Sequence, residues 1–544
     1  MSTGTFELLD YVIFAAYAIV LVSIGFFVSR GKKGEEKSAE DYFLASKSLP
    51  WWAIGSSLIA ANISAEQFIG TSGSGFAGGM AIAAYEFMAA ITLILVGKFF
   101  LPIFIKQGIY TIPEFVERRF SSNLKTILAV FWICLFVFVN LTSVLFLGGT
   151  ALDTVLGNGD GSMTLYAMIG LAVVAAAYSL YGGLSAVAWT DVMQVGLLII
   201  GGLITTIIAL NSVTDGGVMD GISHIYNVAG DHFDMVLEQG HKEYNNMPGI
   251  YMLVGGLWVA NIYYWGFNQY IIQRTLAAKS LEESQRGIIF AAFLKMLIPF
   301  IVVVPGIIAY VMYTEGQFGA PAIFENANGT LNNDSAYPWL IRTFVPTGLK
   351  GLVVAALAAA IVSSLASMLN STSTIFTMDI YKPYMNPNAS QSRLVNVGRL
   401  TAGVALVIAL ILAPMLGGID QVFQFIQEYT GIVSPGILGV FLVGLFWKKA
   451  NNKGAIWGVV LSIPIALFFK FVVGNEAMPF IDQMFYTTIL TIAVIIMVSL
   501  STNKEEEDPK GIKLTYDMFQ TDKVFNICAY VICIMLAIIY AIFW

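Results

Sequence analysis

One long apolar segment, 51–79, constrains the fold more than any other part of the chain, because polar side chains interrupt its centre. Glu66 is its only charged residue, and Asn62, Ser64 and Gln67 lie beside it. In hydrocarbon every backbone amide and carbonyl needs a partner, so such an interruption is tolerated only where it lines a cavity enclosed by protein. We therefore predict a helix that breaks here, with freed carbonyls and polar side chains facing a central site.

The composition is that of a membrane protein. Hydrophobic residues make up 57% of the 544 residues, and charged residues only 12%. This balance excludes an ordinary soluble domain and a disordered chain, and it predicts an all-α polytopic protein in a lipid bilayer. The net charge of -7 sits mostly in loops and indicates no nucleic-acid partner. The N-terminus carries Glu7 and Asp10 without a basic residue, so we expect a retained anchor and no cleavable signal.

Segments of about 20 apolar residues predict fourteen transmembrane spans. They run over 9–29, 51–77, 81–105, 124–152, 162–181, 186–211, 249–273, 287–313, 349–378, 397–416, 420–447, 454–473, 478–500 and 524–543. An even number of spans places both termini on the same side. Lys and Arg concentrate in alternate loops, such as 30–47, 504–523 and the loop that begins at Arg274. This asymmetry predicts a cytoplasmic position for those loops and an outer, periplasmic position for both termini.

The histidines and cysteines of the chain do not indicate a metal site or a disulfide framework. The three histidines fall in the polar outer segment 212–248, where loose spacing favours solvated loop residues over a metal site: His224, His232 and His241. The three cysteines lie in apolar runs and are interpreted as packing residues, without a disulfide framework or metal site: Cys134, Cys528 and Cys533.

A faint internal repeat relates two parts of the chain. Ala61-Asn62-Ile63 recurs as Ala260-Asn261-Ile262, and both copies lie in spans interrupted by polar residues. The next span after each copy carries a charged residue, Glu86 in the first case and Lys295 in the second. Five spans separate the copies, and because this number is odd the two copies are predicted to be inverted in the membrane, as in secondary transporters.

The span 349–378 offers oxygen ligands for a small cation. It has hydroxyls at Ser363 and Ser364 next to an alanine-rich face, and neutral oxygens can replace the water around a sodium ion. Packing between helices through small residues explains the same pattern. Sodium binding becomes the favoured interpretation if the helix of 51–79 breaks, because the carbonyls of Ala60 and Ile63 would then be free to meet the serines.

A second constellation suits a sugar. Sugar hydroxyls donate and accept hydrogen bonds, so their site needs amides, a carboxylate acceptor and an ammonium donor. Intramembrane polar residues of these types are Asn62, Glu66, Gln67, Glu86, Asn261, Lys295 and Gln427. The aromatic run Tyr263-Tyr264-Trp265 could pack against the apolar face of the ring. A structural ion pair between Glu86 and Lys295, and hydrogen bonds between helices for the amides, remain the alternatives. No nucleophile or phosphate-loop motif indicates an enzyme.

Longer stretches of the sequence resemble the sodium/solute symporter family, and the resemblance covers nearly the whole chain. The matching stretches are 60–70, 110–116 (YTIPEFV), 181–186 (YGGLSA), 258–265 (WVANIYYW), 355–371, 444–449 (GLFWKK) and 454–455. The resemblance implies a leucine-transporter-like core of two inverted five-helix repeats. On that basis residues 49–211 and 249–447 are the repeats. Residues 1–48 and 448–544 carry accessory helices, and 212–248 is an outer loop.

The same resemblance implies sodium-coupled uptake of a hexose by alternating access in the inner membrane, with one sodium ion moved per sugar. Carried over by position, sodium is bound by the carbonyls of Ala60, Ile63 and Ala360 and the hydroxyls of Ser363 and Ser364. The sugar is bound by Gln67, Glu86, Asn261, Lys295 and Gln427, with Asn62 close by. Tyr264 is implied as the inner gate, Tyr85 and Phe423 as the outer cover, and Asp191 as a residue on the sodium exit path.

Two positions depart from the family pattern and bear on specificity. Ala89 replaces a hydroxyl residue of the sugar pocket, and Thr71 replaces a methionine of the outer gate. One lost hydrogen bond to a sugar hydroxyl costs about 0.5 to 1.5 kcal/mol, which affects the choice between galactose and glucose. A sodium symporter for proline or sialic acid, a transporter-like sensor and a sugar-gated channel are alternative functions, and the oligomeric state, a dimer included, stays open.

Overall fold

The computed structural model describes residues 6–29, 43, 45–109, 111–157, 159–182, 184–319, 324, 331–417, 419, 421–502 and 507–544. Within these ranges the chain is helical and contains no named strand. Ten helices are long and apolar enough to cross a membrane, and two shorter apolar helices, Leu8–Ile24 and Thr164–Ala177, accompany them in the described part. The prediction of an all-α membrane protein is confirmed at this level. The basic residues predicted at 30–42 and at Lys504 lie outside the described ranges.

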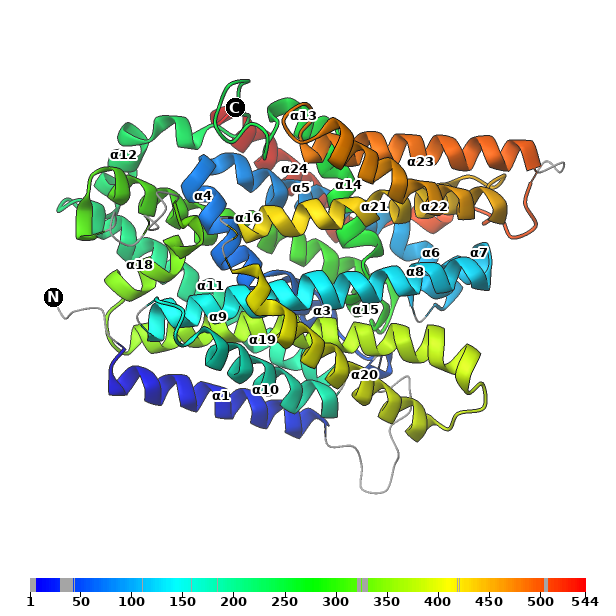
Figure 1. Ribbon diagram of the computed structural model, residues 1–544, viewed down its shortest axis with the longest axis horizontal. Coiled ribbons are helices and arrows are strands. Elements are labelled where there is room, and N and C mark those ends of the chain that lie inside the picture. The colour runs from blue at the N-terminus through cyan, green and yellow to red at the C-terminus, as the bar shows by residue number, and fades with distance from the viewer. Residues whose placement is uncertain are drawn as a thin grey trace.

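Most of the long helices run side by side along the long axis of the molecule, as Figure 1 shows. In chain order the α-helices are α1 (Leu8–Ser29), α3 (Trp51–Asn62), α4 (Ser72–Gly78), α5 (Ala84–Leu95), α6 (Leu101–Gln107), α7 (Ile112–Arg119), α8 (Ser122–Cys134), α9 (Thr142–Leu156), α10 (Thr164–Gly182), α11 (Leu184–Val213), α12 (Val218–Val228), α13 (Gly249–Val254), α14 (Gly256–Ile262), α15 (Gln269–Leu276), α16 (Leu281–Thr314), α18 (Ala336–Phe344), α19 (Leu349–Ile375), α20 (Gln391–Leu412), α21 (Val422–Phe446), α22 (Asn452–Phe468), α23 (Phe480–Thr502) and α24 (Lys523–Ile542). The short helices α12 and α18 gather at the left end of Figure 1.

Helix α19 lies at the centre of the bundle. α19 and the turns that continue it to Met385 form one long helix, and 94% of the most apolar stretch of this helix is buried inside the protein. The corresponding share for α24 is 17%. Small residues fill α19, with alanine at six of the positions 355–366, which lets neighbouring helices approach its backbone closely. α19 packs against α1, α3, α9, α10, α11 and α20, so its serines face the interior of the protein.

The helix predicted to break at the centre of 51–79 does break. α3 ends at Asn62, and Ile63 leaves helical geometry with φ -76° and ψ 91°. The hydroxyl of Ser64 accepts a hydrogen bond from the Glu66 amide, and the Ser64 carbonyl accepts one from the Gln67 amide. These two amides would otherwise bond Asn62 and Ile63, so the carbonyls at the end of α3 are left free for other partners.

The second predicted interruption lies elsewhere in its span. Ala260-Asn261-Ile262 stays helical within α14, and the backbone becomes extended only at Asn268, with φ -84° and ψ 120°. Tyr263 continues the helix as a π-helical turn, Tyr263–Phe267, since no hydroxyl comparable to Ser64 follows Ile262 to compete for the amides. The repeated three letters therefore do not mark the same backbone feature in both copies.

Asp10 attaches α1 to the central helix. Its carboxylate is fully buried and accepts hydrogen bonds from the amides of Gly348 and Gly351, at 2.7 and 2.8 Å. These amides belong to the first turn of α19, where a carboxylate satisfies free donors and complements the helix dipole. Gly351 is required here because a Cβ atom would lie 2.6 Å from the Asp10 backbone.

The outer segment 212–248 packs on the bundle. The His232 ring stacks on Tyr310 with centroids 3.9 Å apart, and His224 pairs with Glu315 at 2.9 Å. No group of three metal-ligating side chains occurs in the described part of the chain. Gly79, with φ +73°, leaves room for this segment, since a Cβ there would lie 2.1 Å from the His232 carbonyl oxygen.

The cysteine interpretation needs correction. Cys134, Cys528 and Cys533 are free thiols, as expected, but Cys134 and Cys533 are exposed on the surface of the helix bundle and do not serve as core packing residues. Both lie in apolar helices, α8 and α24, whose outward faces are as hydrophobic as their inward faces in a bilayer. The apolar residues that flank Cys134 and Cys533 in the sequence therefore did not indicate that these side chains are buried inside the protein.

Candidate functional site

The break in α3 opens onto an internal cavity of about 50 Å³. Such a volume has room for roughly four water molecules. Its wall contains every residue predicted for the sugar pocket, together with Tyr85, Phe423 and Tyr264, whereas Thr71 is not part of it. Further lining residues come from the same helices and, in the case of Met484, from α23. The lining is Asn62, Glu66, Gln67, Tyr85, Glu86, Ala89, Ala260, Asn261, Tyr263, Tyr264, Trp265, Lys295, Phe423, Gln427, Thr430 and Met484.

An ion pair stands at the centre of this wall. Lys295 on α16 donates to the carboxylate of Glu86 on α5 and also to the side-chain oxygen of Asn62. Both charged side chains are almost fully buried, with 1% of Lys295 and 3% of Glu86 exposed. The Lys295 ammonium also lies 5.1 Å from the Trp265 ring centroid, at cation–π distance. The neighbouring helices α3 and α5 therefore meet the distant α16 at one charged network.

The amide of Asn62 extends the network to two tyrosines. It donates to the hydroxyl of Tyr264 at 3.0 Å, and that hydroxyl accepts a second hydrogen bond from Tyr270 at 2.7 Å. Tyr264 is thus fixed at the cavity wall by polar contacts from α3 and α15. The rings of Tyr85 and Phe423, which also line the cavity, meet edge to face with centroids 5.5 Å apart. Aromatic side chains therefore form part of the cavity wall.

Two further polar side chains in the wall have capacity for a ligand. Gln67 accepts a hydrogen bond from Thr71 at 2.9 Å, which leaves its amide N–H groups available. Glu66 is only 8% exposed, and its Oε1 atom has no hydrogen-bond partner among the described residues. Asn261 instead donates to the carbonyl of Leu257 at 3.1 Å within its own helix. The wall thus combines acceptors and donors, as recognition of a polyol requires.

A second polar cluster lies on α19 beside the same break. The Ser364 hydroxyl donates to the carbonyl of Ala61 at 2.9 Å, which joins α19 to the end of α3. Ser363 donates to the carboxylate of Asp191 on α11. The other predicted sodium ligands, Ala60, Ile63 and Ala360, are fully buried at this junction of α3 and α19. The five residues predicted to bind sodium through oxygen atoms therefore lie on, or at the end of, two helices that are in contact.

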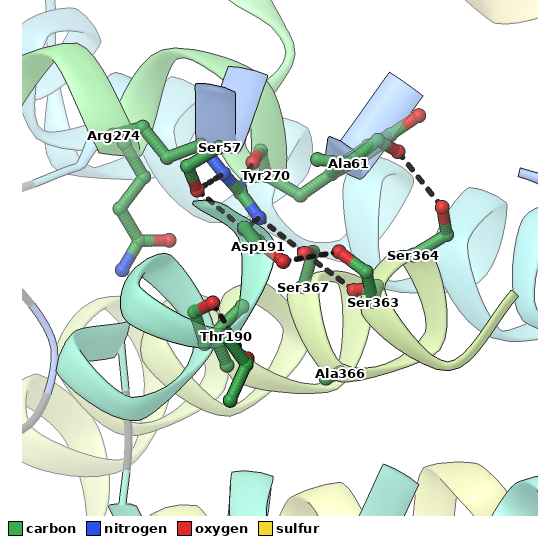
Figure 2. Close-up of polar contacts among 12 residues, drawn as sticks. Ser57, Ala61, Thr190, Asp191, Tyr270, Arg274, Ser363, Ser364, Ala366 and Ser367 are labelled. Atoms are coloured by element: carbon green, nitrogen blue, oxygen red, sulfur yellow. Dashed lines mark hydrogen bonds and ion pairs between the residues drawn. The ribbon is translucent and has the colours of Figure 1, made fainter. Parts of the chain in front are cut away.

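Asp191 is surrounded by hydroxyl and guanidinium groups, shown in Figure 2. It lies two turns into α11, away from the helix start, and is fully buried. Its carboxylate accepts from Ser57 on α3 and from Ser363, and it pairs with Arg274 on α15 at 3.4 Å. An acidic group is tolerated at this depth because three partners share its charge.

Sequence reasoning missed several of these residues. Thr430 and Met484 line the cavity from α21 and α23, and nothing in their local sequence distinguishes them from other residues of apolar spans. Arg274 was counted among loop residues, but α15 continues to Leu276 and buries the Arg274 side chain, which is only 1% exposed. The only available signal for Arg274 was its position as a charged residue at the very end of an apolar span. Ser57 lies within an apolar span and had no such signal.

Comparison with known proteins gives consistent matches. The family model described as the sodium:solute symporter family matches residues 42–462. The chain is 62% identical over 541 residues to a sodium/glucose cotransporter of Vibrio parahaemolyticus, with 98% of each chain covered. It is 33% identical to a sodium/myo-inositol cotransporter 2 of Oryctolagus cuniculus, covering 84% of this chain and 68% of the relative.

Solved structures share the fold. A sodium-coupled sialic acid symporter in a substrate-bound outward-open state superposes with a TM-score of 0.79, at 24% identity, over 92% of this chain and all of the other. A transporter of the nucleobase-cation-symport-1 family in a closed conformation reaches a TM-score of 0.52, at 14% identity, over 89% of this chain and 98% of the other. Both are membrane transporters, so the likeness fits the helical architecture described above.

Proposed function

Because the chain belongs to the sodium:solute symporter family, we propose that it couples the inward flow of sodium to the uptake of a hexose, galactose or glucose, by alternating access. The observation that carries this proposal is the cavity at the α3 break, where the Glu86–Lys295 ion pair and several amides lie between aromatic residues. A neutral polyol uses both charges of such a pair, whereas a carboxylate substrate would prefer an unopposed cation. The glucose and myo-inositol specificities named for two relatives support a polyol.

The sugar site of this proposal consists of Gln67, Glu86, Asn261, Lys295 and Gln427, with Asn62 close by. Their side chains surround one cavity, and its small volume of about 50 Å³ cannot contain a hexose of twelve heavy atoms. Tyr85 and Phe423, or Tyr264, all of which line the cavity, must therefore move when sugar enters or leaves. This requirement supports roles as outer cover for the first two residues and as inner gate for Tyr264.

The co-substrate sodium would be bound between α3 and α19. The carbonyls of Ala60, Ile63 and Ala360 and the hydroxyls of Ser363 and Ser364 supply neutral oxygens, as a reversible sodium site requires. Two observations support this site. Helix α3 ends at Asn62, so the carbonyls of its last turn lack helical partners. The Ser364 hydroxyl also donates a hydrogen bond to the Ala61 carbonyl. Asp191, bonded to Ser363, is a proposed waypoint for sodium leaving the site.

For the architecture we propose fourteen spans, with residues 49–211 and 249–447 as two inverted repeats. The accessory segments are 1–48 and 448–544, and 212–248 forms the outer loop. The fold shared with the sodium-coupled sialic acid symporter supports a transporter core of this kind. In this arrangement the protein is in the inner membrane, with both termini on the periplasmic side, in accord with the basic residues of alternate loops.

The driving force is adequate for this function. One charge that crosses about 100 mV releases roughly 2.3 kcal/mol. A tenfold sodium gradient adds about 1.4 kcal/mol. Their sum corresponds to a sugar gradient of several hundredfold.

Uptake into proteoliposomes tests the proposal. Purified protein is reconstituted, an inward sodium gradient is imposed with potassium as the control, and radiolabelled galactose is followed, with unlabelled glucose, proline and sialic acid as competitors. We expect sodium-dependent accumulation that glucose blocks and proline does not. Failure to accumulate galactose, together with transport of proline or sialic acid, would retain sodium coupling and reject the hexose. Equilibration without accumulation would indicate a channel.

A further inference from the structure

The side chain of Glu66 lines the sugar cavity, and the sugar site proposed above gives it no role. Glu66 is 8% exposed, and its Oε1 atom has no hydrogen-bond partner among the described residues. The backbone from which this side chain extends is held in place. The Glu66 amide donates to the Ser64 hydroxyl at 3.0 Å, and the Glu66 carbonyl accepts from the Thr71 hydroxyl at 3.4 Å. Glu66 therefore presents an unused acceptor at a fixed place in the wall.

The charged groups of the cavity lining do not balance. Its carboxylates are Glu66 and Glu86, and Lys295 is the one basic residue among the described residues that line it. The Lys295 ammonium pairs with Glu86 and also donates to Asn62. A second carboxylate is thus left without a cation in a cavity between membrane-spanning helices, where an unpaired charge is costly. A ligand that brings a positive charge to Glu66 removes this cost.

The rest of the wall restricts what that ligand is. Amides and the Glu86–Lys295 pair suit the hydroxyls of a sugar, so the ligand keeps most of those hydroxyls. The cavity of about 50 Å³ has no room for a bulky charged substituent. A primary amino group that replaces one hydroxyl is of similar size, is protonated at neutral pH and donates charge-assisted hydrogen bonds to a carboxylate. An inorganic cation would neutralise Glu66 but would leave the sugar-binding groups unused.

We propose that the protein also takes up amino sugars, in which a protonated amine replaces one hydroxyl of the hexose, and that Glu66 binds this ammonium group. The proposal rests on the hexose transport proposed above and extends it to cationic substrates. An unopposed carboxylate favours a cationic ligand for the same reason that an unopposed cation favours a carboxylate. Gln67, the next residue, has free amide N–H groups for a neighbouring hydroxyl of the same sugar.

A series of amino sugars tests the proposal on the wild-type protein. Uptake of radiolabelled galactose into proteoliposomes under an inward sodium gradient is inhibited with each galactose derivative that carries one amine, at carbon 2, 3, 4 or 6, and with the matching deoxy sugars. The deoxy sugar lacks both the hydroxyl and the amine, so the ratio of the two half-inhibitory concentrations measures the contribution of the amine. A hydrogen bond to a charged group predicts an advantage of roughly ten- to hundredfold for at least one amine. The derivative with the largest advantage, in labelled form, should also accumulate.

Glu66→Gln then identifies the group that binds the amine. The substitution keeps the size of the side chain and removes its charge, so the ratio for that derivative should fall roughly tenfold or more. Glu66→Asp retains the charge but withdraws it from the cavity by one methylene, so its ratio should lie between those of the wild type and Glu66→Gln. Glu428→Gln is the control, because Glu428 lies outside the sugar cavity lining and its Oε1 atom already has Lys470 at 3.3 Å and Asn475 at 2.8 Å as partners. Its ratio should equal that of the wild type.

Three results would overturn the proposal while sodium-driven galactose uptake leaves the proposed function intact. The first is the absence of an advantage for every amine in the wild type. The second is an unchanged ratio in folded Glu66→Gln; if sodium activation is altered in that variant, Glu66 binds an inorganic ion instead. The third is an amine that competes but does not accumulate, because it is then an inhibitor and no substrate.

Two remaining cases are also decided. If Glu66→Gln does not fold, Glu66→Asp takes its place, and a ratio equal to that of the wild type overturns the proposal. Absence of sodium-driven galactose uptake in the wild type rejects the proposed function itself, and with it the extension to amino sugars.

Discussion

The hydroxyl of Ser364 donates a hydrogen bond to the carbonyl oxygen of Ala61 across the junction of α19 and the broken α3, at 2.9 Å. This contact ties the most buried of the candidate membrane-spanning helices to a place where a membrane-embedded backbone is interrupted. A cation bound at this junction would bridge the same two helices. Because the end of α3 also carries Asn62 into the polar cavity, ion binding and sugar binding share one structural element.

Ser364→Ala is expected to abolish sodium-driven sugar accumulation. The variant removes one oxygen from the proposed ion site, and a hydrogen bond or ligand contact to a charged group contributes about 1.5 to 3 kcal/mol, equivalent to roughly ten- to hundredfold in sodium affinity. Uptake at increasing sodium concentrations provides the measurement. Ser373→Ala is the matched control, because Ser373 is buried on the same helix and its hydroxyl has no partner among the described residues. Normal accumulation in Ser364→Ala would remove this residue from the ion site.

The sequence predicted the α3 break and the cavity wall well because both depend on rare residues. An intramembrane Glu86 or Lys295 is costly unless it is paired, so its presence in an apolar span indicates a polar interior. The break follows from Ser64 and its neighbours, whose side chains compete for backbone amides. These signals are local, so they can be recognised in the sequence without knowledge of how the helices pack.

Other features depend on packing and have no local signal. The polar cluster around Asp191 and Arg274 forms from four helices, and its members Ser57 and Ser367 are ordinary small residues of buried helices. Met484 reaches the cavity from α23, which the sequence assigned to an accessory region. The second copy of the Ala-Asn-Ile motif matched in letters but not in backbone geometry, because the break depends on the residue that follows the motif.

Lys295→Ala is expected to weaken sugar uptake severely. It leaves Glu86 buried without its partner and also removes the donor to Asn62, and loss of one partner of a buried pair costs about 3 to 5 kcal/mol. A hydrogen bond from the ammonium to a sugar hydroxyl contributes about 1.5 to 3 kcal/mol, so the concentration of galactose that gives half-maximal uptake should rise at least about tenfold. The double variant Glu86→Gln/Lys295→Met should recover the amount of folded protein but not the uptake. If uptake recovers as well, the pair is structural and does not bind sugar.

A surface pair supplies the control for that series. Lys448 and Glu507 are 3.1 Å apart with 42% and 57% of their side chains exposed. Exposed pairs contribute less than about 1 kcal/mol, so Lys448→Ala should transport normally.

Ala89→Ser is expected to change the preference between galactose and glucose. Ala89 lines the cavity next to the ion pair, and a serine there adds one donor and one acceptor for a sugar hydroxyl. One such hydrogen bond contributes about 0.5 to 1.5 kcal/mol, so the ratio of the two apparent affinities should move several-fold. Competition between the two sugars measures this ratio. Ala90→Ser adds the same hydroxyl outside the cavity lining, and an equal shift in that variant would argue against a direct contact.

Asp10→Ala is expected to destabilise the packing of α1 on α19. The two amides of the first turn of α19 lose their acceptor, and loss of a helix cap costs about 0.5 to 2 kcal/mol. Hydrogen exchange at the amides of Gly348 and Gly351 should accelerate, and the unfolding temperature should fall. Asp10→Asn, which can still accept a hydrogen bond, should lose less. Unchanged exchange at both amides in Asp10→Ala would show that the cap contributes nothing to stability.

Acid is expected to loosen the outer segment around His232. Burial, and to a lesser extent the nearby Lys242, lower the pKa of this imidazole from 6.5 to about 4. Because the proton then binds more readily when the segment is released, the packed state has its full stability above about pH 6.5 and loses it as the pH falls toward 4. The Met235 amide, which donates to the Phe543 carbonyl at 2.8 Å, reports this packing.

Hydrogen exchange at the Met235 amide, corrected for the intrinsic effect of pH, should accelerate in the wild type as the pH falls from 7 to 4.5. His232→Phe preserves the aromatic stack on Tyr310 and removes the titrating group, so its exchange should change little over the same range. His224→Gln, which alters the exposed pair with Glu315, should behave like the wild type. An identical acid response in His232→Phe would assign the effect to another group.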